Sequence, residues 1–184
     1  ILFEDTTYDA VAAGMNSQRW GGFAASYVRQ ASGGFERRLG PNDSPTTFSV
    51  EQSALTGGWG WYPFRSLAVG LAVKSVRESI GGASASGTGL DAGLLLSAGE
   101  NARLGVTALN LLAPAPSFGG TDGHYPRVFD LSPVYGRALT ADWAVELSAR
   151  LRRVEAQGLE PSGGVELRYG GLAALRLGAK AEGP

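Results

Sequence analysis

The sequence predicts an all-β protein, an antiparallel transmembrane β-barrel with about ten strands in this chain. Three observations predict this fold. Apolar residues recur at every second position, the intervening positions mix small residues with isolated charges, and short and longer connections alternate along the chain. Barrels of this kind lie in the bacterial outer membrane. The expected location is therefore that membrane, and its lipid is the expected partner of the apolar face.

The alternation divides the chain into strand-length segments that turn residues separate. Between residues 67 and 74, for example, Leu67, Val69, Leu71 and Val73 alternate with small residues and Lys74. A soluble β-sandwich also alternates, but its polar face is mostly long and charged, whereas Gly, Ala and Ser dominate here. The expected strands are 8–15, 21–32, 46–60, 66–78, 86–98, 102–112, 127–138, 142–154, 162–170 and 173–182.

The connections between these strands favour the membrane barrel over an ordinary soluble sheet. Outer-membrane barrels have short periplasmic turns and longer external loops, while a soluble meander has no reason to keep two length classes. Short connections are expected at 16–20, 61–65, 99–101, 139–141 and 170–172. Longer ones are expected at 33–45, 79–85, 113–126 and 155–161.

The alternation also assigns side chains to the two faces of the sheet. The residues expected to point into lipid are Leu71, Val73, Leu94, Val106, Val145, Leu147, Leu167 and Leu177. Those expected to face the lumen are Lys74, Asp91, Arg103, Glu146, Arg150, Glu166, Arg168 and Arg176. The lumen charges could select a solute or could pair across neighbouring strands, and their nearly balanced signs favour pairing.

Seven aromatic residues fall at or beside the short turns. Tyr and Trp favour the headgroup level of a membrane, where an apolar ring and a polar N–H or O–H are both satisfied. The alternative is the aromatic core of a soluble sandwich. The clustering predicts a membrane-interface girdle made of Trp20, Trp59, Trp61, Tyr62, Phe64, Trp143 and Tyr169.

The composition excludes several other classes of function. A formal net charge of −1 gives no electrostatic reason to bind nucleic acid. The chain has no cysteine, which excludes thiolate metal sites and cysteine nucleophiles. The uncharged run 104–121 contains Pro114 and Pro116, so it is too interrupted for a membrane helix.

The sequence gives no sign of an enzyme, a cofactor or a metal site. His124 is the only histidine and lies in the connection 113–126, with no serine in an evident nucleophile context. Four acidic residues of the longer connections could meet a divalent cation, but nothing in their spacing requires it. They are Asp43, Asp122, Glu155 and Glu160.

The order of short and longer connections predicts that this single barrel domain, residues 1–184, is incomplete at both ends. The first strand runs into a short turn and the last strand leaves one, which places both ends, Ile1 and Pro184, at the external rim. Whole barrels of this type begin and end in the periplasm. Unpaired edges at 8–15 and 173–182 would be costly in lipid, so further strands or a partner chain should cover them.

Five segments, in this order, resemble strands of the PorV/PorQ-type outer-membrane proteins, relatives of the long-chain fatty-acid transporter barrels. They are Leu67-Ala-Val-Gly-Leu-Ala-Val-Lys74, Gly89-Leu-Asp-Ala-Gly-Leu-Leu95, Leu104-Gly-Val-Thr-Ala-Leu-Asn110, Gly163-Gly-Val-Glu-Leu-Arg168 and Ala174-Leu-Arg-Leu-Gly178. The resemblance covers residues 21–180 and implies a fourteen-stranded barrel. The Asn-Pro-Ala-Gly segment with which the family usually opens is not present in this sequence.

The resemblance also implies a function, which is a non-enzymatic docking or shuttle platform for secreted or surface proteins in a type IX secretion system. The expected partners are other protein subunits or secreted cargo, bound through the external loops. Two alternatives remain open at this point. One is a transporter of hydrophobic small molecules, and the other is a structural membrane anchor of a larger assembly.

Overall fold

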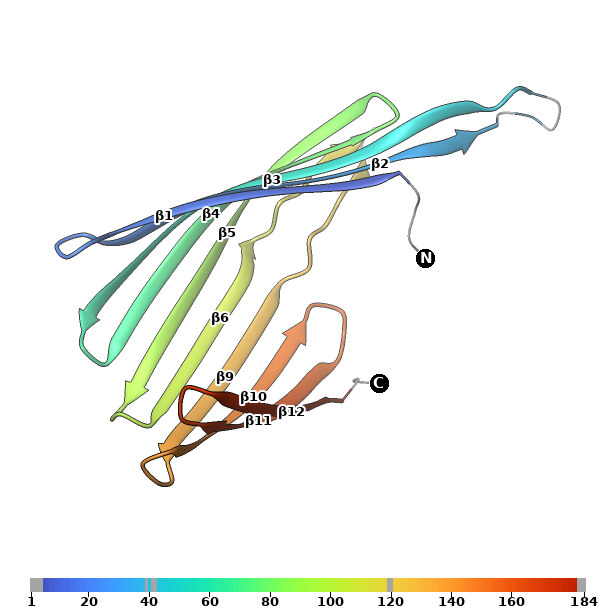
Figure 1. The fold of residues 1–184 in the computed structure, drawn as a ribbon. Helices are drawn as coiled ribbons and strands as arrows, with labels where there is room; N and C mark the ends of the chain where they lie inside the picture. The colour runs from blue at the N-terminus through green and yellow to red at the C-terminus, as the bar shows by residue number, and fades with distance from the viewer. Residues whose placement is uncertain (1–4, 39, 41–42, 119–120, 182–184) are drawn as a thin grey trace. The chain divides into compact units, whose positions relative to one another are not determined.

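The computed structural model describes residues 5–38, 40, 43–118 and 121–181, and every regular element among them is a strand (Figure 1). The strands are β1 (Thr6–Ser17), β2 (Gly21–Arg37), β3 (Thr46–Phe64), β4 (Leu67–Ile80), β5 (Ala83–Ala98), β6 (Ala102–Leu112), β7 (Ser117–Phe118), β8 (Thr121–Asp122), β9 (Val128–Ala138), β10 (Trp143–Val154), β11 (Leu159–Tyr169) and β12 (Ala173–Lys180). The prediction of an all-β protein is confirmed. A search of these residues for a helix long and apolar enough to cross a membrane finds none.

Ten of the strands form one antiparallel sheet in the order β1-β2-β3-β4-β5-β6-β9-β10-β11-β12, and β7 and β8 form a small separate hairpin. All ten expected strands are present. Strands β6, β9 and β10 end within one residue of their expected positions, and each of the others has at least one end displaced by two to five residues. Strands β7 and β8 have only two residues each, which is too short for an alternation of apolar and polar residues, so the sequence pattern does not predict this hairpin. Closure of the sheet into a barrel is not detected in the described residues, where the order ends at β1 and β12.

The expected strict alternation of short and longer connections is wrong at two places. The connection between β4 and β5 is only residues 81–82, and the one between β10 and β11 is only residues 155–158. Gly81 and Gly82 have φ values of 57° and 90°. Two consecutive residues with positive φ form the tight turn that matches the twist of a hairpin, so both strands continue up to it. The connections 38–45 and 113–127 are long, as expected.

The chain divides into two compact units. The first contains Ile1–Trp59, Ala72–Leu90 and Leu112–Tyr125; the second contains Gly60–Leu71, Asp91–Leu111 and Pro126–Pro184. Four strands contribute residues to both units, namely β3, β4, β5 and, with its last residue Leu112, β6. The expectation of one domain over residues 1–184 stays a prediction.

In the first unit, β1 and β2 pair in one register from Thr6 opposite Ser32 to Ser17 opposite Gly21. Because side chains alternate across a strand, this register divides the hairpin into two faces of different character. One face carries the large side chains Val11, Met15, Phe23 and Tyr27. The other face carries mainly small residues, namely Ala10, Ala12, Gly14, Ala24 and Ser26.

In the second unit, β6 and β9–β12 form a continuous series of ladders. Their registers collect the charged side chains on one face and the large apolar side chains on the other. The charged side, which carries Arg103, Glu146, Glu166 and Arg176, is called the polar face. The opposite side, called the apolar face, carries Val106, Leu131, Leu147, Val165 and Leu177.

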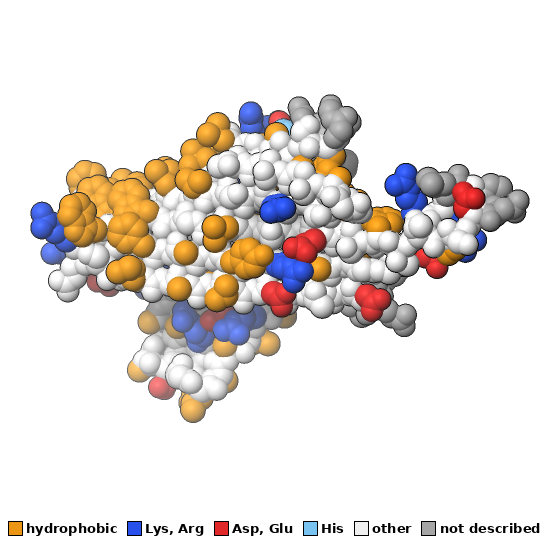
Figure 2. Space-filling view, turned by 90° about the horizontal axis from the view of Figure 1, so that it is seen from above, with side chains coloured by type: hydrophobic (Ala, Val, Ile, Leu, Met, Phe, Trp, Pro, Cys, Tyr) orange, Lys and Arg blue, Asp and Glu red, His pale blue; other side chains and the backbone are white. Residues whose placement is uncertain are grey.

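The apolar side chains of the sheet are exposed rather than packed in a core (Figure 2). Leu147 is 50% exposed and Leu177 64%; in β4, Val73 is 54% exposed. Among the described strand residues, the only buried apolar side chains are Val76, Val128 and Val154. A soluble protein rarely leaves so large an apolar surface open, so this surface requires an apolar environment or a covering layer.

Candidate functional site

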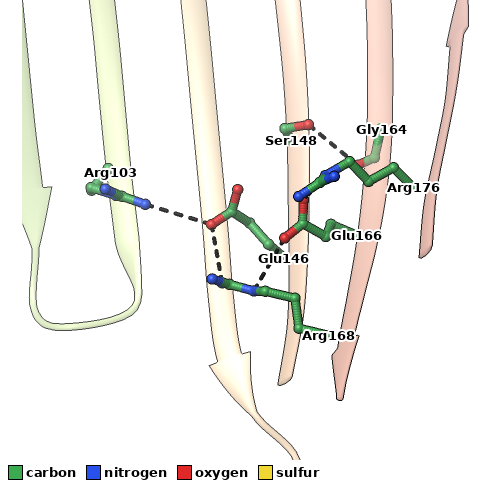
Figure 3. Close-up of polar contacts among 7 residues, drawn as sticks. All are labelled: Arg103, Glu146, Ser148, Gly164, Glu166, Arg168 and Arg176. Carbon is green, nitrogen blue, oxygen red and sulfur yellow. Dashed lines mark hydrogen bonds and ion pairs between the residues drawn. The ribbon is translucent and has the colours of Figure 1, made fainter. Parts of the chain in front are cut away.

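The polar face of the second unit contains a cross-strand network of two carboxylates and three guanidinium groups (Figure 3). The registers place Glu146 of β10 directly opposite Glu166 of β11, and Glu166 directly opposite Arg176 of β12. Like charges directly opposite each other destabilise a sheet. Compensating positive charges are therefore needed around this pair.

Three arginines supply these charges. Arg168 lies between the two carboxylates, with its Nε 3.2 Å from Glu166 Oε1 and its Nη2 3.7 Å from Glu146 Oε2. Arg103 Nη2 lies 3.6 Å from the same Oε2 atom, and Arg176 is hydrogen bonded to Glu166. The structure thus brings together five of the eight residues expected to face a lumen. The network carries one net positive charge.

Arg150, a sixth predicted residue, belongs to a second charged group on the same face. Its Nε and Nη2 donate to the two carboxylate oxygens of Asp130 at 2.7 and 2.8 Å, a bidentate geometry that gives strong and directional hydrogen bonds. Asp130 is only 7% exposed. Nearby, Lys180 Nζ lies 3.0 Å from Glu160 Oε2. Sequence reasoning missed Asp130, although its alternation with Phe129 and Leu131 could have placed it on this face.

The two remaining predicted residues, Lys74 and Asp91, lie near the segment that follows β6. Asp91 Oδ1 accepts the backbone N–H of Asn110 at 2.7 Å, and Asn110 Nδ2 donates to the Pro126 carbonyl at 2.6 Å. Asn110 has a φ of 57°, a left-handed conformation that Asn tolerates better than most residues. These bonds fix the two ends of the connection between β6 and β9.

This connection folds back onto β5 instead of extending away from the sheet. A Cβ atom on Gly87 would lie 2.7 Å from Ala115 N, and one on Gly89 would lie 2.8 Å from Pro114 Cγ and 2.9 Å from Lys74 Cε. Pro114 and Pro116 are fully buried. The two glycines leave the space that the Pro114 ring fills. The segment therefore covers the face of β5 that carries Gly87 and Gly89, beside Lys74.

Tyr125 attaches the far end of the same segment to β4. Its hydroxyl donates to Glu78 Oε1 at 2.5 Å. Glu78, Lys74 and the buried Val76 share one face of β4, because they alternate along that strand. Partial burial of the phenol, followed by its hydrogen bond to Glu78, raises the pKa of Tyr125 to about 12. The alternation did not predict that residues 113–125, called the inward-folded segment, pack against β5. The two glycines of β5, Gly87 and Gly89, and the two prolines of the segment, Pro114 and Pro116, were a usable signal.

The Tyr125 contact should be lost only in strong alkali. Because the folded-state pKa is raised, the contact contributes its full stability below the ordinary tyrosine value of about 10 and loses it as the pH rises through about 12. In an absorbance titration of tyrosinate formation, we expect the Tyr125→Phe variant to lose a step near pH 12. Tyr8→Phe is the control and should keep that step. Identical curves for wild type and Tyr125→Phe would contradict the assignment.

The first unit contains a charged group that the sequence did not indicate. Arg29 of β2 lies 3.6 Å from Asp9 Oδ2 and 2.8 Å from Glu51 Oε2, which joins β1, β2 and β3. By the register of β1 and β2, Arg29 and Asp9 share a face with Tyr27 and Val11. This triad lies beyond the large apolar side chains of that face, toward the end with the longer connection.

Four of the seven aromatic residues expected in a membrane girdle form two pairs. Trp143 and Tyr169 are paired across β10 and β11, with ring centroids 4.8 Å apart. Trp59 Nε1 donates to the Trp20 carbonyl at 2.8 Å. Trp61 and Tyr62 are consecutive in β3 and point to opposite faces, as do Trp61 and Phe64. One membrane-facing girdle therefore cannot contain all seven residues.

The described ranges hold no group of three or more His, Cys, Asp or Glu side chains that could bind a metal ion. His124 is exposed in the connection that leads to β9. The termini Ile1 and Pro184, expected at one rim, and the side chain of Asp122 lie outside the described residues.

Neither a scan against protein-family models nor a search of the curated proteins returns a match for this chain. The similarity to PorV/PorQ-type proteins consequently rests on the five sequence segments alone. The geometry of the two faces bears on function independently of this similarity.

Proposed function

We propose that this chain forms part of the wall of an outer-membrane β-barrel, with its apolar face in lipid and its polar face toward the lumen. The observation that carries this proposal is the contrast between the two faces of the sheet. The side chains of the apolar face are exposed, and the charged side chains of the polar face are paired with one another. The pairing matters because charges in a confined, hydrated lumen are compensated across strands, as Arg103, Glu146 and Arg168 are.

The dimensions of the apolar face support this proposal. On β10 the apolar positions run from Trp143 through Leu147 to Leu151, and Arg153 follows at the next position of that face. At about 3.4 Å per residue this stretch is about 27 Å long. A tilted transmembrane strand needs about 9–11 residues, which agrees with that length. A soluble sheet has no reason to limit its apolar stretch to this span.

A docking role is the function that we propose for the part of the chain outside the lipid. Strands β2 and β3 contain 17 and 19 residues, which exceeds the length needed to cross the membrane. The excess lies toward the connection 38–45, and the triad of Arg29, Asp9 and Glu51 lies on that side of the strands. These projecting strands offer a surface for other subunits or secreted cargo, in agreement with the PorV-type resemblance.

Transport of hydrophobic small molecules has less support. An apolar groove of about 590 Å³ exists, and its lining includes Leu96, Leu104, Tyr135 and Leu147. These side chains belong to the apolar face, so in this proposal the groove opens to lipid and not to the lumen.

The membrane proposal can be tested with single cysteine substitutions, since the chain contains no cysteine of its own. Leu131 and Ser132 are neighbours in β9 on opposite faces. We expect a small fluorophore attached to Leu131→Cys in reconstituted vesicles to be strongly quenched by brominated lipid acyl chains. The same fluorophore attached to Ser132→Cys is the matched control and should be quenched weakly. Equal quenching at both positions would overturn the proposal.

A further inference from the structure

A small basic pocket lies on the apolar face, at the end of β9 and β10 that is remote from Trp143. Three successive rows of side chains define its position. Leu131 is opposite Leu151, and Phe129 is opposite Arg153. In the next row Arg127 is opposite Glu155, joined by the bond from Glu155 N to the Arg127 carbonyl. The face thus changes from apolar to basic within two rows.

The pocket has a volume of about 410 Å³ and is lined by Arg127, Phe129, Arg153, Glu155, Ala156 and Gln157. Ala156 has a φ of 61° and lies in the turn after β10. Glu155 is the one acidic residue of this lining, and its Oε2 accepts the backbone N–H of Arg127 at 3.0 Å. Two guanidinium groups against one carboxylate leave the pocket with one net positive charge.

Apolar side chains adjoin the pocket on the side of the membrane span. Phe129 belongs to its lining, and Leu159 of β11 is directly opposite Arg153. Leu159 is exposed, as are Leu131 and Leu151. A ligand that suits this site has an anionic group for the arginines and an apolar part that follows these side chains.

We propose that this pocket binds the phosphate of a membrane lipid headgroup, with the acyl chain lying along Leu131, Leu151 and Leu159. The inference rests on the proposed membrane location, because only there does the boundary between Leu151 and Arg153 coincide with the headgroup level. Arginine is suited to phosphate, since its planar fork donates two hydrogen bonds to neighbouring oxygens. Basic pockets at the edge of the hydrocarbon region bind anionic headgroups in this way.

A lipid phosphate explains the site better than free phosphate does. A free anion would gain nothing from the exposed Phe129 and Leu159 side chains, whereas a lipid uses both halves of the site. Glu155 repels any phosphate, but its Oε2 already accepts the backbone N–H of Arg127. The site therefore prefers a single phosphate group bound between two arginines.

The test uses the whole chain, purified in a neutral detergent and titrated with diphosphoryl lipid A, dephosphorylated lipid A or inorganic phosphate, with bound lipid counted by native mass spectrometry. We expect binding of the phosphorylated lipid and a loss of about tenfold or more in affinity for Arg127→Gln/Arg153→Gln, since each guanidinium makes charge-assisted hydrogen bonds. Arg137→Gln is the matched control, because Arg137 lies on the same face of β9 toward the other end, and it should bind normally.

The possible outcomes separate this inference from the proposed function. Equal binding of phosphorylated and dephosphorylated lipid, or an unchanged affinity in the double variant, would overturn the phosphate site. Inorganic phosphate that competes fully at similar concentration would show a simple anion site and would also overturn it. A milder variant, Arg153→Lys, keeps the charge and should lose part of the affinity while folding normally. A fluorophore on Leu131→Cys that lipid does not quench would instead contradict the membrane location itself.

Discussion

We expect Leu147→Arg to block assembly of the protein in the membrane. Leu147 lies near the middle of the apolar stretch of β10, between Tyr135 of β9 and Val165 of β11, and is half exposed. An arginine at the midplane of a barrel's lipid face costs about 2–4 kcal/mol. That cost is a large part of the stability of an ordinary domain. The measurement is the fraction of folded protein in lipid vesicles, read from its heat-dependent mobility on a gel.

The neighbouring substitution Ser148→Arg is the matched control. Ser148 lies on the polar face, where its hydroxyl is 3.4 Å from the Gly164 carbonyl and its row neighbours are Val134 and Gly164. An added arginine there meets an environment that already holds Arg103 and Glu146. Folding should therefore remain close to that of the wild type. Equal loss of folded protein in both variants would indicate a sheet with no lipid-facing side.

The second large effect concerns the inward-folded segment. We expect Gly87→Val to release residues 113–125 from β5, because a Cβ at this position would lie 2.7 Å from a backbone nitrogen, Ala115 N, and 3.1 Å from Pro114 Cβ. No side-chain rotation relieves a clash with backbone. Overpacking of this kind costs about 1–3 kcal/mol, which corresponds to about fivefold to 150-fold more frequent opening. Limited proteolysis of the segment measures that increase.

Gly93→Val is the control for the loss of a glycine in β5. Gly93 and Gly87 have the same parity in the strand, but a Cβ on Gly93 would lie 3.7 Å from Val106 O, an ordinary contact distance. Its proteolysis should match that of the wild type. Equal protection of the segment in Gly87→Val and wild type would mean that the contact with β5 does not hold the segment in place.

The strands could be predicted from the sequence because apolar residues occupy every second position wherever one face of the sheet is apolar. The series from Trp143 to Leu151 predicted both the existence of β10 and the face of each side chain. The turn at Gly81 and Gly82 was harder, because a run of small residues reads equally as a loop or as strand ends that meet at two positive φ angles. The fold back of Pro114 onto Gly87 is a long-range contact, and no local period encodes it.

The contacts of the polar face, like the contact of Pro114 with Gly87, could not be predicted from the local sequence pattern. Alternation placed Arg103, Glu146 and Arg176 on one face, but their partners depend on the register between strands. Asp130 pairs with Arg150 because β9 and β10 are aligned so that Asp130 lies one row from it. Arg29 and Glu51 lie within the expected strands 21–32 and 46–60, but their contact likewise depends on how β2 and β3 are aligned. The sequence pattern carries no direct measure of these alignments.

The order of charges across β11 and β12 has a consequence for assembly itself. Strands rich in Gly and Ala can slide along each other, and a shift by two residues keeps every apolar side chain on its proper face. In the observed alignment Glu166 meets Arg176. A shift of β12 by two residues in one direction would set Arg176 against Arg168, and in the other direction would leave Glu166 opposite Ala174. The charges therefore favour the observed alignment of β11 and β12 over these two alternatives, which hydrophobicity alone does not distinguish.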